Sequence, residues 1–195
     1  MRKQVKFTDS LAKNLSYIKD GDNSKLCQIL FNEQKGFCAY TETYLGRTDQ
    51  KDIDHFNSSK SFTDRNKYQN IFLCKAQWNR EKSNKWGKYQ PILSPLDVNF
   101  EERISYNQDL KLFEATDEED REAVNLVELL KLDDYDLSVE RKKYIELCIE
   151  LMQYYENPTI YFQKIIQKNI NNLQFIRSLE IEFNIDIWNM IPQPE

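Results

Sequence analysis

The single histidine of the chain, His55, follows directly after Asp54 in the alternating segment KDIDHF. A neutral imidazole is well suited to take a proton from water near neutral pH, because its ordinary pKa is about 6.5. Neighbouring side chains on a strand point to opposite faces, so Asp54 is not expected to contact the His55 ring. A carboxylate oxygen of Asp54 and the amide oxygen of Asn79 are instead suited to a hard cation such as Mg²⁺, with waters and a substrate phosphate completing its coordination. The residues predict metal-assisted chemistry on a phosphate.

The pattern around His55 predicts the elements that would position it. Apolar residues at helical spacing favour a helix over 25–35, and Gly36 stands where a C-terminal stop is expected. Two short strands are expected, one over 51–56 and one in the run NIFLC that Asn70 opens. Between them lies a polar loop.

A short helix is expected after Cys74, ending at Gly87. Asn79 and Lys82 lie three residues apart on it and therefore share one face. An Asp-His pair alone is expected by chance in roughly one chain in five of this length. A functional reading of the Asp-His pair is favoured by the order of strand, loop, strand and helix around it.

The rest of the chain favours helices. One or two short strands are expected around 103–106 and 110–113, and an acid-led helix within 117–132. A further helix follows Asp136 until Asn157 and Pro158 end it, and the last third is again helical. We therefore expect an α+β fold that is mainly helical.

We expect one compact unit with three parts. These are an N-terminal helical lead-in (1–36), a core around the histidine (37–90) and a helical C-terminal region (91–195). Hydrophobic residues make up 40% of the chain and only four glycines and five prolines occur, as in helical globular proteins. No apolar run approaches the roughly 20 residues of a membrane span, and four widely spaced cysteines suggest reduced thiols in the cytoplasm.

Basic charge is concentrated around the histidine. The chain carries a net charge of −5, but residues 51–90 contain nine Lys or Arg against four Asp or Glu. A basic face suits phosphate, although a solvated surface explains such a run equally well. Arg80, Lys85 and Lys88 flank the predicted metal site and are candidates for binding nucleic acid, with exposed helix charges as the alternative.

The segments DIDHF, NIFLC and WNREKSN together resemble the HNH endonucleases. The resemblance implies a ββα-metal, or His-Me, finger in which His55 is the general base and Asp54 and Asn79 hold one Mg²⁺ or Mn²⁺. It also implies that Asn70 pins the loop that orients His55. Lys82 would lie near the scissile phosphate and offset its developing charge.

A wider resemblance covers most of the chain. The upstream NEQKGFCAYTE and the downstream PILSPLDVNFEERISY are similar to the PtuB-type nucleases of Septu and retron-associated antiphage systems. That family works with an ABC/SMC-like ATPase of the PtuA type. We expect such a partner to dock on the helical half, Asp120 to Phe183, because a partner that delivers the substrate would let an overall acidic protein act on nucleic acid.

The sequence departs from the family at a zinc site. Many HNH proteins bind structural zinc through two Cys-x-x-Cys pairs, but here Thr41 replaces a cysteine and Cys74 has no second thiol near it. Four thiolates cannot be assembled, so no structural zinc is expected, and Cys38 and Cys74 are expected to be buried apolar residues. The finger is then expected to be held by aromatic packing of Phe72, Trp78 and Trp86.

These observations favour a metal-dependent endonuclease that hydrolyses phosphodiester bonds, with DNA favoured over RNA as substrate. The alternative is a binding or scaffold module that keeps the finger without cleaving anything. The presence of Asp54, His55 and Asn79 favours the enzyme. A zinc-dependent transcription factor is excluded by the cysteine count.

Overall fold

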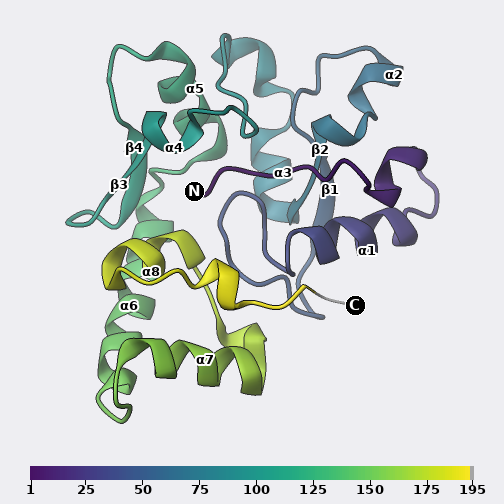
Figure 1. Ribbon diagram of the computed structural model, residues 1–195. Helices are drawn as coiled ribbons and strands as arrows, with labels where there is room; N and C mark the ends of the chain where they lie inside the picture. Colours follow the sequence, from purple (N-terminus) through teal and green to yellow (C-terminus); the bar gives the residue numbers. More distant parts are fainter. Residues whose placement is uncertain (194–195) are drawn as a thin grey trace.

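Short hairpins and a larger set of helices make up the α+β fold in the computed structural model, which describes residues 1–193 (Figure 1). The helices are α1 (Ser24–Glu33), α2 (Phe62–Arg65), α3 (Ala76–Lys82), α4 (Phe100–Arg103), α5 (Arg121–Leu130), α6 (Tyr135–Met152), α7 (Pro158–Asn169) and α8 (Ile176–Phe183). The strands are β1 (Lys51–His55), β2 (Ile71–Lys75), β3 (Ile104–Asn107) and β4 (Leu112–Ala115). Short 3-10 helices are η1 (Leu11–Asn14), η2 (Tyr68–Asn70), η3 (Lys85–Tyr89), η4 (Ile170–Asn172) and η5 (Trp188–Met190).

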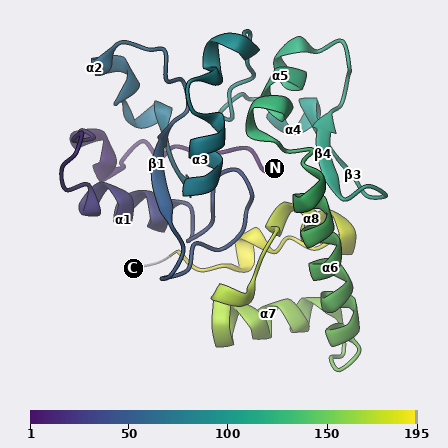
Figure 2. The ribbon, with the colours of Figure 1, turned by 180° about the vertical axis from the view of Figure 1, so that it is seen from behind.

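The centre of the fold is the antiparallel hairpin of β1 and β2, in which Asp54 pairs with Phe72 and His55 with Ile71. Helix α3 follows β2 without a loop and lies beside β1 (Figure 2). The expected order of strand, loop, strand and helix is therefore present. The second hairpin, β3 with β4, also agrees with the expected strands.

The segment expected as a plain loop contains helical turns, so that expectation was wrong in part. Helix α2 forms there because the Ser61 hydroxyl accepts a hydrogen bond from the Asp64 backbone N–H and caps the first turn. Helix η2 then leads into β2. These turns shorten the path between the two strands and fix its shape.

Helix α3 ends at Lys82, with Ser83 as its C-terminal cap, and not at Gly87, where the sequence suggested the stop. The Ser83 backbone has a positive φ of 40° and its N–H closes the last turn on Asn79. After this bend, η3 brings Trp86 into the core, where its ring lies 5.0 Å from that of Phe56. Burial of the indole ring explains why the chain leaves the helix early.

Asn157 and Pro158 begin a helix, whereas the sequence pattern suggested that they end one. Helix α6 already stops at Met152. The Asn157 side chain accepts from the Ile160 N–H, and Pro158 occupies the first turn of α7, where its missing N–H costs no hydrogen bond. The same dipeptide is thus an N-terminal cap.

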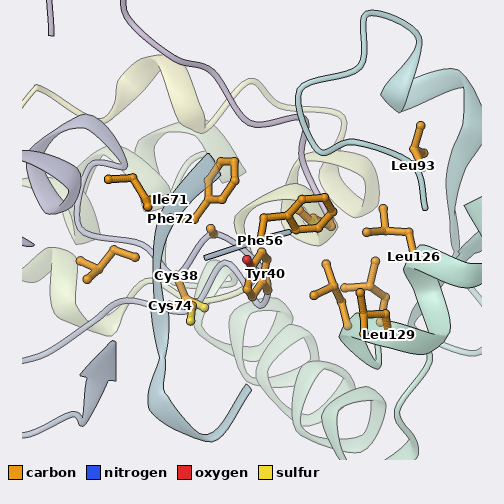
Figure 3. Close-up of a cluster of buried hydrophobic side chains, with 14 of the residues drawn as sticks. Cys38, Tyr40, Phe56, Ile71, Phe72, Cys74, Leu93, Leu126 and Leu129 are labelled. Atoms are coloured by element: carbon orange, nitrogen blue, oxygen red, sulfur yellow. The ribbon is translucent and has the colours of Figure 1, made fainter. Parts of the chain in front are cut away.

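Buried apolar side chains form two clusters. The first joins the central hairpin, α1 and α5, and Figure 3 shows it running from Cys38 and Phe72 to Leu126 and Leu129. The second joins α6, α7 and α8 and includes Phe37. The clusters therefore meet between residues 37 and 38.

Within residues 1–193, no helix combines the length and the apolar character that a membrane crossing requires.

Candidate functional site

His55 stands at the end of β1, half-buried, with its ring held from two sides. The ring nitrogen Nε2 lies 2.8 Å from the Asn66 side-chain oxygen, and the Tyr17 ring packs edge-on at 4.8 Å between centroids. An amide oxygen can only accept, so Nε2 carries the proton and Nδ1 holds the free lone pair. The arrangement leaves one ring nitrogen able to accept a proton.

The environment of His55 favours its neutral form. Burial lowers the pKa of the His55 imidazole below its ordinary value, and the positive charge of Arg65 acts in the same direction. The hydrogen bond to Asn66 opposes them without reversing the shift. At pH 7 the ring is therefore predominantly neutral, as a general base must be.

Asn70 ties the two ends of the loop beside His55 together. Its side-chain oxygen accepts from the Asn57 N–H at 3.0 Å, and its amide nitrogen donates to the carbonyls of Asn57 at 3.2 Å and Arg65 at 2.8 Å. The side chain is buried. Asn70 thereby fixes the turn that presents Asn66 to His55.

Asp54 faces away from His55 and is buried in an ion pair. Its Oδ1 lies 2.9 Å from Nζ of Lys82, and its Oδ2 accepts from the Tyr40 hydroxyl. Burial, followed by the charge of Asp54, raises the pKa of Tyr40 well above its usual value, so the hydroxyl keeps its proton. Both carboxylate oxygens are therefore engaged by donors from the chain itself.

Lys82 is enclosed as well. Besides Asp54, its ammonium donates to the backbone carbonyls of His55 at 2.9 Å and Phe56 at 3.0 Å, and the residue is only 1% exposed. An ammonium has three N–H groups, so these contacts satisfy it. Lys82 fixes the backbone of β1 at His55 instead of projecting toward a bound phosphate.

The Asn79 side chain, which was expected to supply an amide oxygen to a metal ion beside Asp54, contacts Asp52. Its amide nitrogen donates to a carboxylate oxygen of Asp52 at 3.1 Å. Asp52 lies two residues before Asp54, on the same face of β1. The described residues contain no group of three His, Cys, Asp or Glu side chains suited to a metal ion. Because Asp54 is taken up by Lys82 and Tyr40, Asp54 and Asn79 do not fit joint ligation of a divalent cation in this arrangement.

The predicted phosphate-binding side chains are spread over the surface of α3 and η3. Arg80, Lys85 and Lys88 are exposed. Arg80 reaches the Gln50 side-chain oxygen at 3.5 Å, and the Lys88 ammonium lies 4.9 Å from the Tyr89 ring centroid. None of these contacts joins them to His55.

The thiols of Cys38 and Cys74 are free and buried, and they lie side by side next to Tyr40 (Figure 3). Cys38 Sγ accepts from the Lys75 N–H at 3.4 Å, and burial raises the pKa of Cys74 well above its usual value. Thr41, in the place of a third thiol, shares a hydrogen bond of 2.8 Å with Thr43. The pair is packed as apolar core, among aromatic rings.

The sequence did not single out Tyr17, Tyr40, Arg65 and Asn66, which the structure brings to His55 and Asp54. Asn66 and Arg65 stand in the polar segment between the strands, where nothing in their spacing marks them. Tyr17 comes from the N-terminal segment. Only the fold brings them near the histidine.

Comparison of the chain with family models, with curated proteins and with solved structures found no match. The functional argument therefore rests on its own residues.

Proposed function

We propose that this protein is an HNH-type endonuclease that hydrolyses phosphodiester bonds of nucleic acid, DNA in preference to RNA, with His55 as general base. The observation that carries the proposal is the neutral His55 ring, held through Nε2 by Asn66 with Nδ1 free, at the end of a hairpin that runs straight into a helix. The basic character of residues 51–90 supports a polyanionic substrate.

In the proposed reaction, His55 Nδ1 accepts a proton from water while the water oxygen forms a bond to phosphorus. The bond from phosphorus to the leaving ribose oxygen breaks, and that oxygen takes a proton from solvent. Asn66 and Tyr17 hold the ring, and Lys82 holds its backbone. Lys82 and Asn70 are positioning residues in this scheme.

The family resemblance implies Mg²⁺ or Mn²⁺, which would neutralise charge on the phosphate when bound. Asp54 and Asn79 have other partners here, so no step is assigned to the ion. A dependence of cleavage on added Mg²⁺ or Mn²⁺ remains part of the proposal, as a measurement on the protein with and without EDTA.

The test is cleavage of supercoiled plasmid, linear duplex, single-stranded DNA and RNA by the purified protein, alone and with its ATPase partner. His55→Ala is expected to remove activity, because general-base catalysis contributes about 10²- to 10⁴-fold. Arg47→Ala, an exposed change on another loop, is the control. Equal activity of His55→Ala and the parent would exclude His55 as the base.

A second candidate is a binding module with an inactive finger. The observation that favours it is the enclosure of Asp54, because Lys82 and Tyr40 together engage both of its carboxylate oxygens. The same assay separates the two: binding of nucleic acid without cleavage of any substrate, with either ion and with the partner present, supports the module.

We also propose that an ABC/SMC-like ATPase of the PtuA type docks on the helical half, in an antiphage system. A groove of about 550 Å³ lies between α6 and α7 and is lined by Leu147, Leu151, Tyr154 and Tyr155, among others. Leu147, Leu151 and Tyr154 are exposed. Apolar and tyrosine side chains of this kind are typical of protein interfaces.

A further inference from the structure

Arg65 carries a guanidinium group that the described part of the chain does not neutralise. Its Nε is buried and has no hydrogen-bond partner among residues 1–193, and none of the ion pairs there includes it. Because no carboxylate of the described residues pairs with Arg65, its guanidinium is open to an anion at the terminal N–H groups. An anion with several oxygens matches the fork of N–H groups on arginine.

The position of Arg65 next to His55 is set by the loop. Asn70 holds the Arg65 carbonyl, and the next residue, Asn66, contacts the imidazole. The charge of Arg65 is also felt at the ring, where it lowers the pKa of His55. A phosphate on Arg65 therefore lies close to the proposed base.

An exposed aromatic ring accompanies the guanidinium. Phe62 is 62% exposed, and the centre of the Arg65 guanidinium lies 5.7 Å from its ring centroid. Both belong to α2, at the outer edge of the molecule (Figures 1 and 2). An open ring face beside a cation is the combination on which unpaired bases stack.

We propose that α2 binds a single-stranded stretch of nucleic acid, with Arg65 on a phosphate and Phe62 stacked on the neighbouring base. This inference rests on the proposed function and specifies its substrate: the strand reaches His55 unpaired, because a base stacked in a duplex offers no free face to Phe62. It also assigns the binding of phosphate to α2, and not to Lys82.

Binding is measured without cleavage, by fluorescence anisotropy of a labelled 12-nucleotide DNA and of its duplex, with full-length His55→Ala protein in EDTA. Arg65→Gln, introduced into the His55→Ala protein, is expected to weaken binding of the single strand about tenfold. It is also expected to reduce the magnitude of the slope of log K against log salt concentration by about 0.7. Phe62→Ala is expected to weaken single-strand binding about tenfold and to leave duplex binding unchanged.

Two further variants separate a contact from a fold effect. Arg65→Lys keeps the charge and is expected to keep the salt slope while losing part of the affinity. Arg47→Gln removes the same charge from an exposed loop and is expected to change neither the affinity nor the salt slope. Equal losses for Arg65→Gln and Arg47→Gln, or no binding by the His55→Ala parent, would overturn the inference. Cleavage that needs His55 but not Arg65 would overturn it and leave the proposed function intact.

Discussion

Lys82 and Asp54 form an ion pair of 2.9 Å in which each side chain is 2% exposed. Removing one partner of such a pair leaves a buried charge without compensation. The Lys82 ammonium therefore supplies the counter-charge that Asp54 needs in the interior between β1 and α3.

The first prediction is that Lys82→Met destabilises the protein by about 3–5 kcal/mol, because Asp54 then stays buried without a counter-charge. The double change Lys82→Met with Asp54→Asn is expected to cost less than Lys82→Met alone. Urea denaturation measures both, with exposed Lys88→Met as the control. If Lys82→Met cost no more than Lys88→Met, the buried pair would not hold the core.

The second prediction concerns the titration of His55. The protein has one histidine, so its imidazole gives a single set of NMR signals. Burial and the charge of Arg65 lower its pKa, and the midpoint is expected below about 6.5. Arg65→Gln is expected to raise the midpoint, whereas Arg47→Gln leaves it unchanged. Cleavage should rise with pH to a plateau once the ring is neutral; a midpoint above 6.5 would contradict the geometry.

The third prediction links stability to pH through Lys6. Its ammonium lies over the rings of Tyr68 and Phe72, at 4.4 and 4.2 Å, and burial lowers the pKa of Lys6 to about 7. Between pH 7 and about 10.5 the unfolded chain binds more protons at this site, so its contribution to the free energy of unfolding rises with pH and is unfavourable below pH 7.

Lys6→Met is therefore expected to stabilise the protein most below pH 7, with a gain that shrinks toward pH 10. Urea denaturation across this range measures the difference from the parent. Lys19→Met, at an exposed position, serves as the control, and its free energy of unfolding should change with pH as that of the parent does. A constant difference for Lys6→Met would show that the Lys6 pKa is not lowered.

The fourth prediction is that Asn70→Ala loosens the loop beside His55. The change removes three hydrogen bonds to Asn57 and Arg65 and is expected to cost about 1–3 kcal/mol. Hydrogen exchange of the amides in 57–69 should accelerate more than exchange in α5. Exposed Asn84→Ala is the matched control, and equal exchange in both variants would show that Asn70 does not hold the loop.

The fifth prediction tests the groove between α6 and α7. Leu147→Asp together with Leu151→Asp is expected to abolish co-purification with a PtuA-type ATPase, because charge is placed on the exposed apolar lining. Leu11→Asp makes the same change at an exposed leucine in the N-terminal segment and should not affect co-purification. Retained co-purification of the double variant would place the partner elsewhere.

Periodicity and cap residues were enough to predict α1, the central hairpin and the order of strand, loop, strand and helix. Those features depend on neighbours in sequence, such as the apolar face of 25–35 and the turn at Gly36. The end of α3 was not predictable in this way, since it depends on Trp86 packing against Phe56. Asn157 and Pro158 were ambiguous because the same pair can end one helix or begin the next.

The sequence suggested which residues belong together but not how they pair. It proposed His55, Asp54, Asn79 and Lys82 as one site, and the common face of the last two follows from helical spacing. Lys82 pairs with Asp54 and Asn79 bonds to Asp52, and this pairing depends on how α3 is placed along β1. Asn66 could not be found because the loop must fold back across eleven positions to reach His55.

Phe37 and Cys38 are consecutive residues, yet one belongs to the cluster of α6 to α8 and the other to the cluster around the hairpin. Lys35, close by, donates to the carbonyls of Trp188 and Ile191. Local unfolding around one cluster therefore displaces the backbone at residues 35–38, on which the other cluster also depends.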